Sequence, residues 1–126
     1  KGKTKFSLVT SGPFEGLPAE TSAHIYRIVQ EGLNNAARHA HAKNVKVSMI
    51  NVQNEKTRSW NIELIVSDDG SNGLQSPLTR LSGLGLVGVR ERVYALAGTF
   101  SAGPRDPNGF ELRVSLPIGD RTTKAA

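Results

Sequence analysis

The sequence predicts an α+β fold, a two-layer α/β sandwich in which helices lie on one face of a mixed, mainly antiparallel sheet. Apolar residues at helical spacing predict one long helix over residues 18–40. Alternating apolar and polar residues predict two strands, 45–52 and 60–67, which a polar segment joins as an antiparallel hairpin. A second helical pattern follows, and then a further alternating strand over 110–116. Long separations between helices and paired strands fit this arrangement better than an alternating parallel fold.

The chain is predicted to begin with a short strand and the long helix. Residues 4–9 form the strand, which the glycine and proline of the turn at 11–13 would end. Pro18 suits the first turn of the helix, because its missing N–H would lack an intrahelical partner there in any case. Glu20 suits the positive end of the helix dipole.

The second half contains a long loop, a helix and a strand. Residues 68–82 hold glycines, serines and a proline, and a loop of that length is a candidate lid over a ligand. From Leu86 onward apolar residues recur at helical spacing, and Gly98 is placed to end that helix. We expect one domain over residues 1–118 and a flexible tail over 119–126.

Composition narrows the functional classes. Of the 126 residues 37% are hydrophobic, which is enough for one modest core. The absence of cysteine excludes a disulfide framework, a thiolate metal site and a cysteine nucleophile. No apolar run approaches the roughly 18–20 residues that cross a bilayer, and the first ten residues lack the apolar stretch of a signal peptide, so we expect a cytoplasmic location and no direct membrane contact. The net charge of +5 suits a polyanion, either a nucleic acid or a nucleotide triphosphate.

The long helix carries polar residues of an unusual kind. At roughly 100° per residue, its apolar residues are expected to gather on the side that faces the sheet. Four polar residues are expected on the opposite side: Glu31, Asn34, Asn35 and Arg38. One interpretation is a solvated face with a salt link between Glu31 and Arg38. Adjacent asparagines are poor helix formers, however, and this favours a ligand site.

These residue types suit phosphoryl transfer. The amide oxygen of an asparagine is a hard ligand suited to Mg²⁺, and an arginine reaches a phosphate oxygen. A nearby carboxylate such as that of Glu31 acts as a base or orients a water molecule. Phosphoryl transfer requires these three functions.

Two segments that contain glycines add to this pattern. Asp68-Asp69-Gly70 follows a predicted strand and is typical of a tight turn in a plain hairpin; the alternative is that a buried Asp68 accepts a hydrogen bond from the exocyclic amine of adenine. Residues 83–88, Gly-Leu-Gly-Leu-Val-Gly, directly precede the second helix, where free amides and the helix dipole favour an anion. This G-x-G-x-x-G does not lie between a first parallel strand and its crossover helix, which argues against a dinucleotide-binding fold. The sequence also contains no P-loop Gly-Lys-Ser/Thr.

Three segments together resemble the signature of the histidine-kinase ATPase superfamily, which is shared with Hsp90, gyrase B and MutL. Residues 31–40, Glu-Gly-Leu-Asn-Asn-Ala-Ala-Arg-His-Ala, look like its N box, residues 68–70 like its G1 box and residues 83–92 like its G2 box. Their order and spacing match through nearly the whole chain. The amino-acid sequences of residues 26–35 and 88–93 are most similar to those of sensor histidine kinases that are partners of NarL-type regulators.

The resemblance implies a Bergerat fold that binds ATP and Mg²⁺ between the long helix and a flexible lid. It implies an ATP-dependent protein histidine kinase of two-component signal transduction. The implied partners are a histidine-bearing dimerisation domain and, through the full-length protein, a response regulator, with no nucleic acid expected. Among the residues, Glu31 would be the general base or water-orienting carboxylate, and Asn35 would be the Mg²⁺ ligand. Arg38 would contact phosphate, with His39 near the ribose or phosphates.

The glycine-bearing boxes would hold the two ends of the nucleotide. Asp68 would bind the adenine amino group, and Gly70 would shape that wall of the site. The backbone amides that would hold the phosphates are those of Gly83, Leu84, Gly85 and Leu86.

The chain departs from the family pattern at two positions. Asn72 stands at the last glycine of the G1 pattern Asp-x-Gly-x-Gly, with Gly73 one place later. Near the end, Gly109-Phe110-Glu111 stands where the family commonly has Gly-Thr-Thr. A threonine that usually supports the adenine aspartate therefore has no equivalent.

No histidine of this chain resembles the phosphoacceptor motif of the family. His24, His39 and His41 all lie on or just after the predicted long helix. We therefore expect a catalytic domain whose phosphoacceptor histidine lies on another domain. Two alternatives stay open: an anti-sigma-factor-like serine kinase of the same fold, and a non-enzymatic basic module that binds nucleic acid or a partner protein.

Overall fold

A computed structural model describes the chain at residues 3–39, 42–70, 86–106 and 108–119, with the backbone alone at 37–39 and 119. The predicted loop over 68–82 lies outside these residues from 71 onward, and the predicted tail over 119–126 lies outside them from 120 onward. The helices and strands follow in this order: β1 (Lys5–Ser11), α1 (Ala19–His39), β2 (Asn44–Gln53), β3 (Trp60–Asp68), α3 (Leu86–Ala95), β4 (Thr99–Pro104) and β5 (Phe110–Gly119).

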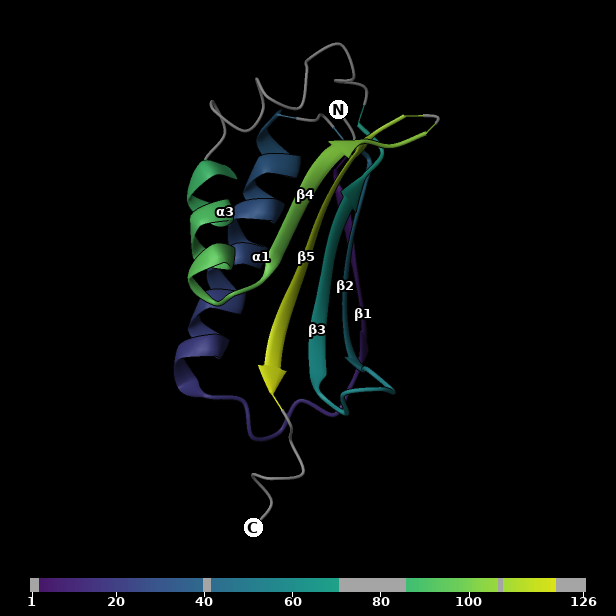
Figure 1. Ribbon diagram of the computed structural model, residues 1–126. Coiled ribbons are helices and arrows are strands. Elements are labelled where there is room, and N and C mark those ends of the chain that lie inside the picture. Colours follow the sequence, from purple (N-terminus) through teal and green to yellow (C-terminus); the bar gives the residue numbers. More distant parts are fainter. Residues whose placement is uncertain (1–2, 40–41, 71–85, 107, 120–126) are drawn as a thin grey trace.

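The sheet confirms the predicted fold class. Its strand order is β1-β2-β3-β5-β4, with β1 parallel to β2 and every other neighbouring pair antiparallel. α1 and α3 both lie on one face of the sheet, and the described part of the chain places no helix on the other face (Figure 1). Within the described residues, neither helix is both long and apolar enough to span a membrane.

Two strand predictions were incomplete. β4 pairs with β5 although the sequence predicted no strand over 99–104. β5 also continues past Pro117, which lacks the N–H of an ordinary ladder residue. The register shifts here, so that Pro117 pairs with Asn61 and Gly119 pairs with Trp60. An irregularity of this kind lets a strand accommodate proline without ending.

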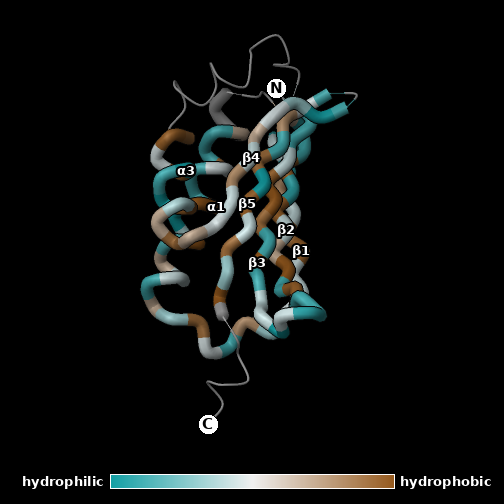
Figure 2. The backbone as a smooth tube through the Cα atoms, in the orientation of Figure 1, coloured by the Kyte–Doolittle hydropathy of each residue, from teal (hydrophilic) through white to brown (hydrophobic). Residues whose placement is uncertain are grey.

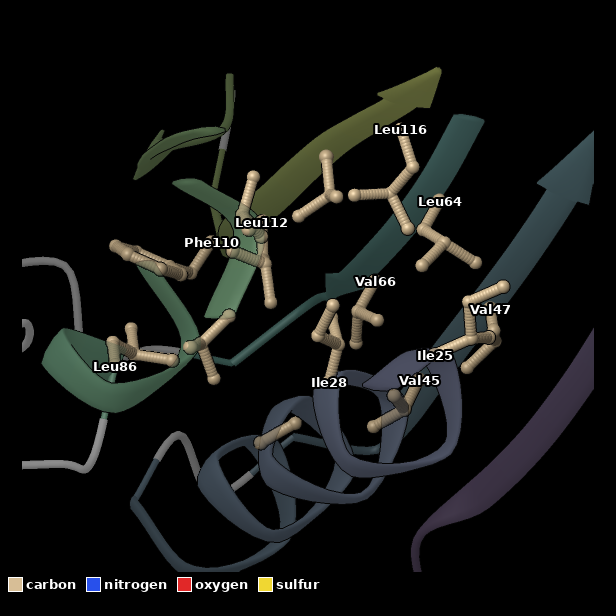
Figure 3. Close-up of a cluster of buried hydrophobic side chains, with 14 of the residues drawn as sticks. Ile25, Ile28, Val45, Val47, Leu64, Val66, Leu86, Phe110, Leu112 and Leu116 are labelled. Atoms are coloured by element: carbon tan, nitrogen blue, oxygen red, sulfur yellow. The ribbon is translucent and has the colours of Figure 1, made fainter. Parts of the chain in front are cut away.

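The hydrophobic core lies between the helices and the sheet. Strands β3 and β5 alternate between buried and more exposed residues, and Figure 2 shows the corresponding alternation of hydropathy along the strands. Buried side chains of both helices pack against the strand residues (Figure 3). The fully buried members with the largest side chains are Ile28, Ile62, Leu64, Leu86, Leu116, Val45, Val89, Val93 and Val114.

α1 approaches β3 closely at Gly32. A Cβ atom at this position would lie 3.1 Å from Cγ2 of Val66. A larger side chain would therefore push the helix away from the sheet. The glycine fixes the depth at which the next turn of α1, which contains Asn35, lies against β3.

The carboxylate of Asp69 joins the end of β3 to the segment that follows α1. Its Oδ1 accepts hydrogen bonds from the backbone N–H groups of Lys43 and Asn44, both at 2.9 Å. Its Oδ2 accepts a bond from Nδ2 of Asn44 at 2.8 Å. The backbone bond from Asn44, followed by its side-chain bond, holds the pKa of Asp69 below the ordinary value.

α3 ends in a Schellman motif. The N–H of Gly98 donates to the carbonyl of Val93 at 2.9 Å, and the N–H of Ala97 donates to that of Tyr94 at 3.0 Å. The sequence predicted only that Gly98 would end this helix, and the left-handed residue of the motif is Ala97, with φ of 61°. Gly98 is needed for a different reason, because a Cβ there would lie 2.4 Å from the carbonyl oxygen of Ser115.

We predict opposite effects for substitutions at these two neighbouring positions. Ala97→Gly should raise the free energy of unfolding by about 0.5–1 kcal/mol, because glycine adopts positive φ without a steric cost. Gly98→Ala should lower it by about 2 kcal/mol or more, because the added methyl group would overlap a backbone oxygen of β5. Urea denaturation measures both, and two changes of the same sign would contradict this assignment.

We also predict that Asp69→Asn lowers the free energy of unfolding at pH 7 by about 1 kcal/mol, since it removes the negative charge that strengthens three solvent-exposed hydrogen bonds. The pKa of Asp69 is depressed in the folded state, so its contribution is present above the unfolded pKa of about 3.9 and is lost as the pH falls through the folded pKa. The deficit of the variant should therefore shrink below about pH 4. The exposed Glu55, as Glu55→Gln, is the control, and a deficit that does not depend on pH would refute the role of the charge.

Candidate functional site

The described elements that carry predicted site residues meet at one end of the sandwich. The C-terminal end of α1, the end of β3 and the start of α3 lie at this end, beside the turn between β4 and β5 (Figure 1). The N–H of Asp69 donates to the carbonyl of Asn44 at 3.2 Å, so the segment after α1 is in direct contact with the end of β3. The fold therefore brings the predicted N box and G1 box together.

The prediction for Asn35 was wrong about its orientation. Asn35 was expected on the side of α1 opposite the sheet, but it is only 6% exposed. Seven residues advance a helix by about 700°, nearly two full turns, so Asn35 lies on the same side as the fully buried Ile28. Asn34 is exposed and Glu31 is half-buried. The polar residues of α1 therefore do not form a single outward stripe.

The amide oxygen of Asn35 is buried and unsatisfied. Its Oδ1 has no hydrogen-bond partner among the residues that the structure describes. An unpaired buried polar atom costs about 1–3 kcal/mol, and native structures contain few of them. A hard cation accepts an amide oxygen as a ligand. Asn35 therefore fits the Mg²⁺ site that the family resemblance implies.

The other predicted residues of α1 lie near Asn35 along the helix. Glu31 is one turn earlier, and residues four positions apart are neighbours on a helix surface. Arg38 and His39 belong to the last turn, where the structure describes the backbone. The alternative of a salt link between Glu31 and Arg38 lies outside the described side chains.

Asp68 is the last residue of β3 and is 4% exposed. In the sheet it pairs with Val45 on one side and Phe110 on the other, and both of these residues are buried. Its side chain therefore points to the face that the helices cover. Oδ1 of Asp68 accepts a hydrogen bond from the N–H of the buried Gly70 at 2.9 Å. This bond fixes the turn that leaves β3, and a carboxylate has capacity for several further donors.

Only part of the predicted phosphate-binding segment is described. Gly83, Leu84 and Gly85 lie outside the described residues. Leu86 is the first residue of α3, and its side chain is fully buried in the core (Figure 3). Leu86 therefore offers a ligand its backbone N–H, which belongs to the first turn of a helix and has no intrahelical acceptor.

Sequence reasoning missed the turn between β4 and β5. Nη1 of Arg105 donates to the carbonyl oxygen of Asp68 at 2.9 Å, and Nδ2 of Asn108 donates to that of Asp69 at 2.9 Å. The Pro and Asn-Gly residues over 104–109 mark a turn in the sequence. No sequence signal marks the contacts of this turn with Asp68 and Asp69, which lie 37 and 39 positions earlier in the chain.

Comparison with known proteins finds sensor histidine kinases. Sensor histidine kinase ComP of Bacillus subtilis (strain 168) is 33% identical over 103 residues, which cover 81% of this chain and 13% of ComP. The signal transduction histidine-protein kinase/phosphatase UhpB of Salmonella typhimurium is 41% identical over 93 residues, which cover 74% of this chain and 17% of UhpB. The chain thus spans less than a fifth of either relative.

Solved structures share the fold. The ATP binding domain of PrrB from Mycobacterium tuberculosis matches with a TM-score of 0.67 and 26% identity, over 91% of this chain and 80% of that one. Histidine kinase AdeS of Acinetobacter baumannii matches with a TM-score of 0.65 and 19% identity, over 93% of this chain and 55% of that one. A family model described as "Histidine kinase-, DNA gyrase B-, and HSP90-like ATPase" matches residues 20–120. The chain belongs to this ATPase family, in agreement with the resemblance that its N, G1 and G2 boxes carry.

Proposed function

We propose that this chain binds ATP with Mg²⁺ and supplies the γ-phosphate for phosphorylation of a histidine on a separate dimerisation domain. The observation that carries the proposal is the buried Oδ1 of Asn35, which has no hydrogen-bond partner in the described part of the chain and lies at the N-box position. Bound Mg²⁺ would neutralise negative charge on the phosphates. Asn35 would hold it, and phosphate oxygens and water would complete the ligand set.

We propose that the remaining predicted site residues surround the bound nucleotide. The half-buried carboxylate of Glu31 would orient or deprotonate the attacking group, one turn from Asn35. Arg38 and His39, in the following turn, would contact the phosphates or ribose. The carboxylate of the buried Asp68 would accept a hydrogen bond from the amino group of adenine on the helix-covered face of the sheet.

Backbone groups would contact the nucleotide at both ends, the base and the phosphates, in addition to the side chains. Gly70 follows Asp68 and is buried, so it would form part of the adenine wall. The amides of Gly83, Leu84, Gly85 and Leu86 would bind the phosphates at the N-terminal end of α3.

The proposed partners follow from the names of the relatives. Both ComP and UhpB are named as histidine kinases, and this favours the sensor-kinase interpretation over an anti-sigma-factor-like serine kinase. Since the chain spans a small share of each relative, we propose that the phosphoacceptor histidine lies elsewhere in a longer protein. A response regulator would then receive the phosphoryl group, on the cytoplasmic side of the membrane.

Titration with a non-hydrolysable ATP analogue, with and without Mg²⁺, tests the proposal, and we predict that Asn35→Ala loses the Mg²⁺-dependent gain in affinity. The free energy of unfolding should change by about 1 kcal/mol or less, because the variant removes an amide oxygen that has no hydrogen-bond partner in the described structure. Asn34→Ala, at the exposed neighbouring position, is the matched control. Equal Mg²⁺ dependence in Asn35→Ala and the wild type would exclude Asn35 as the ligand.

We further predict that Asp68→Asn weakens binding of the ATP analogue by about 10- to 100-fold, the range expected for a hydrogen bond to a charged group. Binding of the matching GTP analogue should weaken less, because guanine presents an acceptor where adenine presents its amine. Calorimetry with both analogues measures the ratio of affinities. The exposed Asp106, as Asp106→Asn, controls for the change of charge, and an unaltered preference for ATP in Asp68→Asn would mean that another group recognises the base.

A further inference from the structure

The peptide units of Asp68 and Asp69 are held by side chains of the turn between β4 and β5. The guanidinium of Arg105 donates to the carbonyl oxygen of Asp68 at 2.9 Å. The side-chain amide of Asn108 donates to the carbonyl oxygen of Asp69 at 2.9 Å. Both side chains therefore bind the main chain and leave the carboxylate of Asp68 to other donors.

The turn itself is closed tightly over the end of β3. The N–H of Arg105 donates to the carbonyl of Gly109 at 2.9 Å, so the two ends of the turn are joined. Gly109 has φ of +108°, and a Cβ at this position would lie 1.9 Å from the carbonyl oxygen of Asp68. Only glycine permits both this conformation and this approach. The turn therefore rests directly on the Asp68 peptide.

Arg105 reaches Asp68 from the side opposite its carboxylate. Together with Lys5 and Lys46, Arg105 lines a hollow of about 530 Å³. Lys46 is exposed between the buried Val45 and Val47 of β2, so this hollow lies on the face of the sheet away from the helices. The carboxylate of Asp68 points to the other face, between the buried Val45 and Phe110. A nucleotide on the helix-covered face would therefore contact the carboxylate and not the guanidinium.

We propose that Arg105 and Asn108 are positioning residues that set base specificity by fixing the direction of the Asp68 carboxylate. Asp68 is the last residue of its strand, and the peptide that follows it is held by the N–H of Asp69, which donates to the carbonyl of Asn44, and by the bond from Arg105 to its carbonyl oxygen. Bonds to the carbonyls of Asp68 and Asp69 prevent rotation of the two following peptide planes, and a recognition group must be held to within about 0.5 Å to be effective. This inference rests on the proposed binding of ATP, and it adds the residues that make the adenine contact selective.

The test compares five proteins by calorimetry with ATP and GTP analogues in the presence of Mg²⁺: the wild type, Arg105→Ala, Arg105→Lys, Asn108→Ala and Arg113→Ala. Arg105→Ala and Asn108→Ala should each lower the ratio of ATP to GTP affinity by about 3- to 10-fold, the size expected for a coupled pair. Arg113→Ala removes the same charge from an exposed site that pairs with Glu111, and it should leave the ratio unchanged. Arg105→Lys, which keeps the charge and a donor, should restore part of the ratio.

A double-mutant cycle separates positioning from a general loss of stability. In the Asp68→Asn background, Arg105→Ala should no longer alter the ratio, because its effect passes through the carboxylate. Equal losses of ATP and GTP affinity, or an effect that persists without the carboxylate, would overturn the inference. If neither Arg105→Ala nor Asn108→Ala changed the ratio, this inference would be overturned and the proposed binding of ATP would stand. If the wild type did not bind ATP, the proposed function and this inference would fail together.

Discussion

The structure depends on how the polar groups at the end of β3 are satisfied, because three chain segments meet there. The Asp69 carboxylate binds the amides after α1, and the Asp68 carboxylate binds the amide of Gly70. The two carbonyls accept bonds from the turn between β4 and β5. A buried backbone group left without a partner would cost free energy comparable to a lost hydrogen bond. The same bonds that meet this requirement also fix the relative positions of α1, β3 and the β4–β5 turn.

Asn35 contrasts with this well-satisfied end of β3. Its amide oxygen is buried beside the core and has no partner among the described residues, in a helix position that alanine would fill at lower cost. Local rules of stability are most often broken at functional sites, where a ligand supplies what the fold omits. Gly32, one turn earlier, keeps α1 close to β3 and so maintains the burial of this oxygen. The proposed metal ligand is thus placed by packing.

The sequence predicted the helices and strands whose hydrophobic periodicity is strong. It did not predict a short strand without clear alternation or side chains that bind the main chain. β3 and β5 were recognisable because apolar residues alternate along them, whereas β4 is short and contains glycine and proline. The orientation of Asn35 was mistaken because polar residues were assigned to one stripe by type, although Asn34 and Asn35 differ by about 100° around the helix. The roles of Arg105 and Asn108 leave no local pattern, since their partners are main-chain atoms that any residue would supply.

The sheet also divides the proposed site into two sides. The carboxylate of Asp68 faces the helices, whereas Arg105 reaches the same residue from a hollow on the other face. Where the family commonly has a threonine beside the adenine aspartate, this chain has Phe110, a buried core residue paired with Asp68. Phenylalanine supplies no hydroxyl group to hold a carboxylate. Support through the main chain, from the face away from the helices, is compatible with an apolar neighbour on the helix-covered face. The loss of the threonine is therefore consistent with a carboxylate that remains fixed in direction.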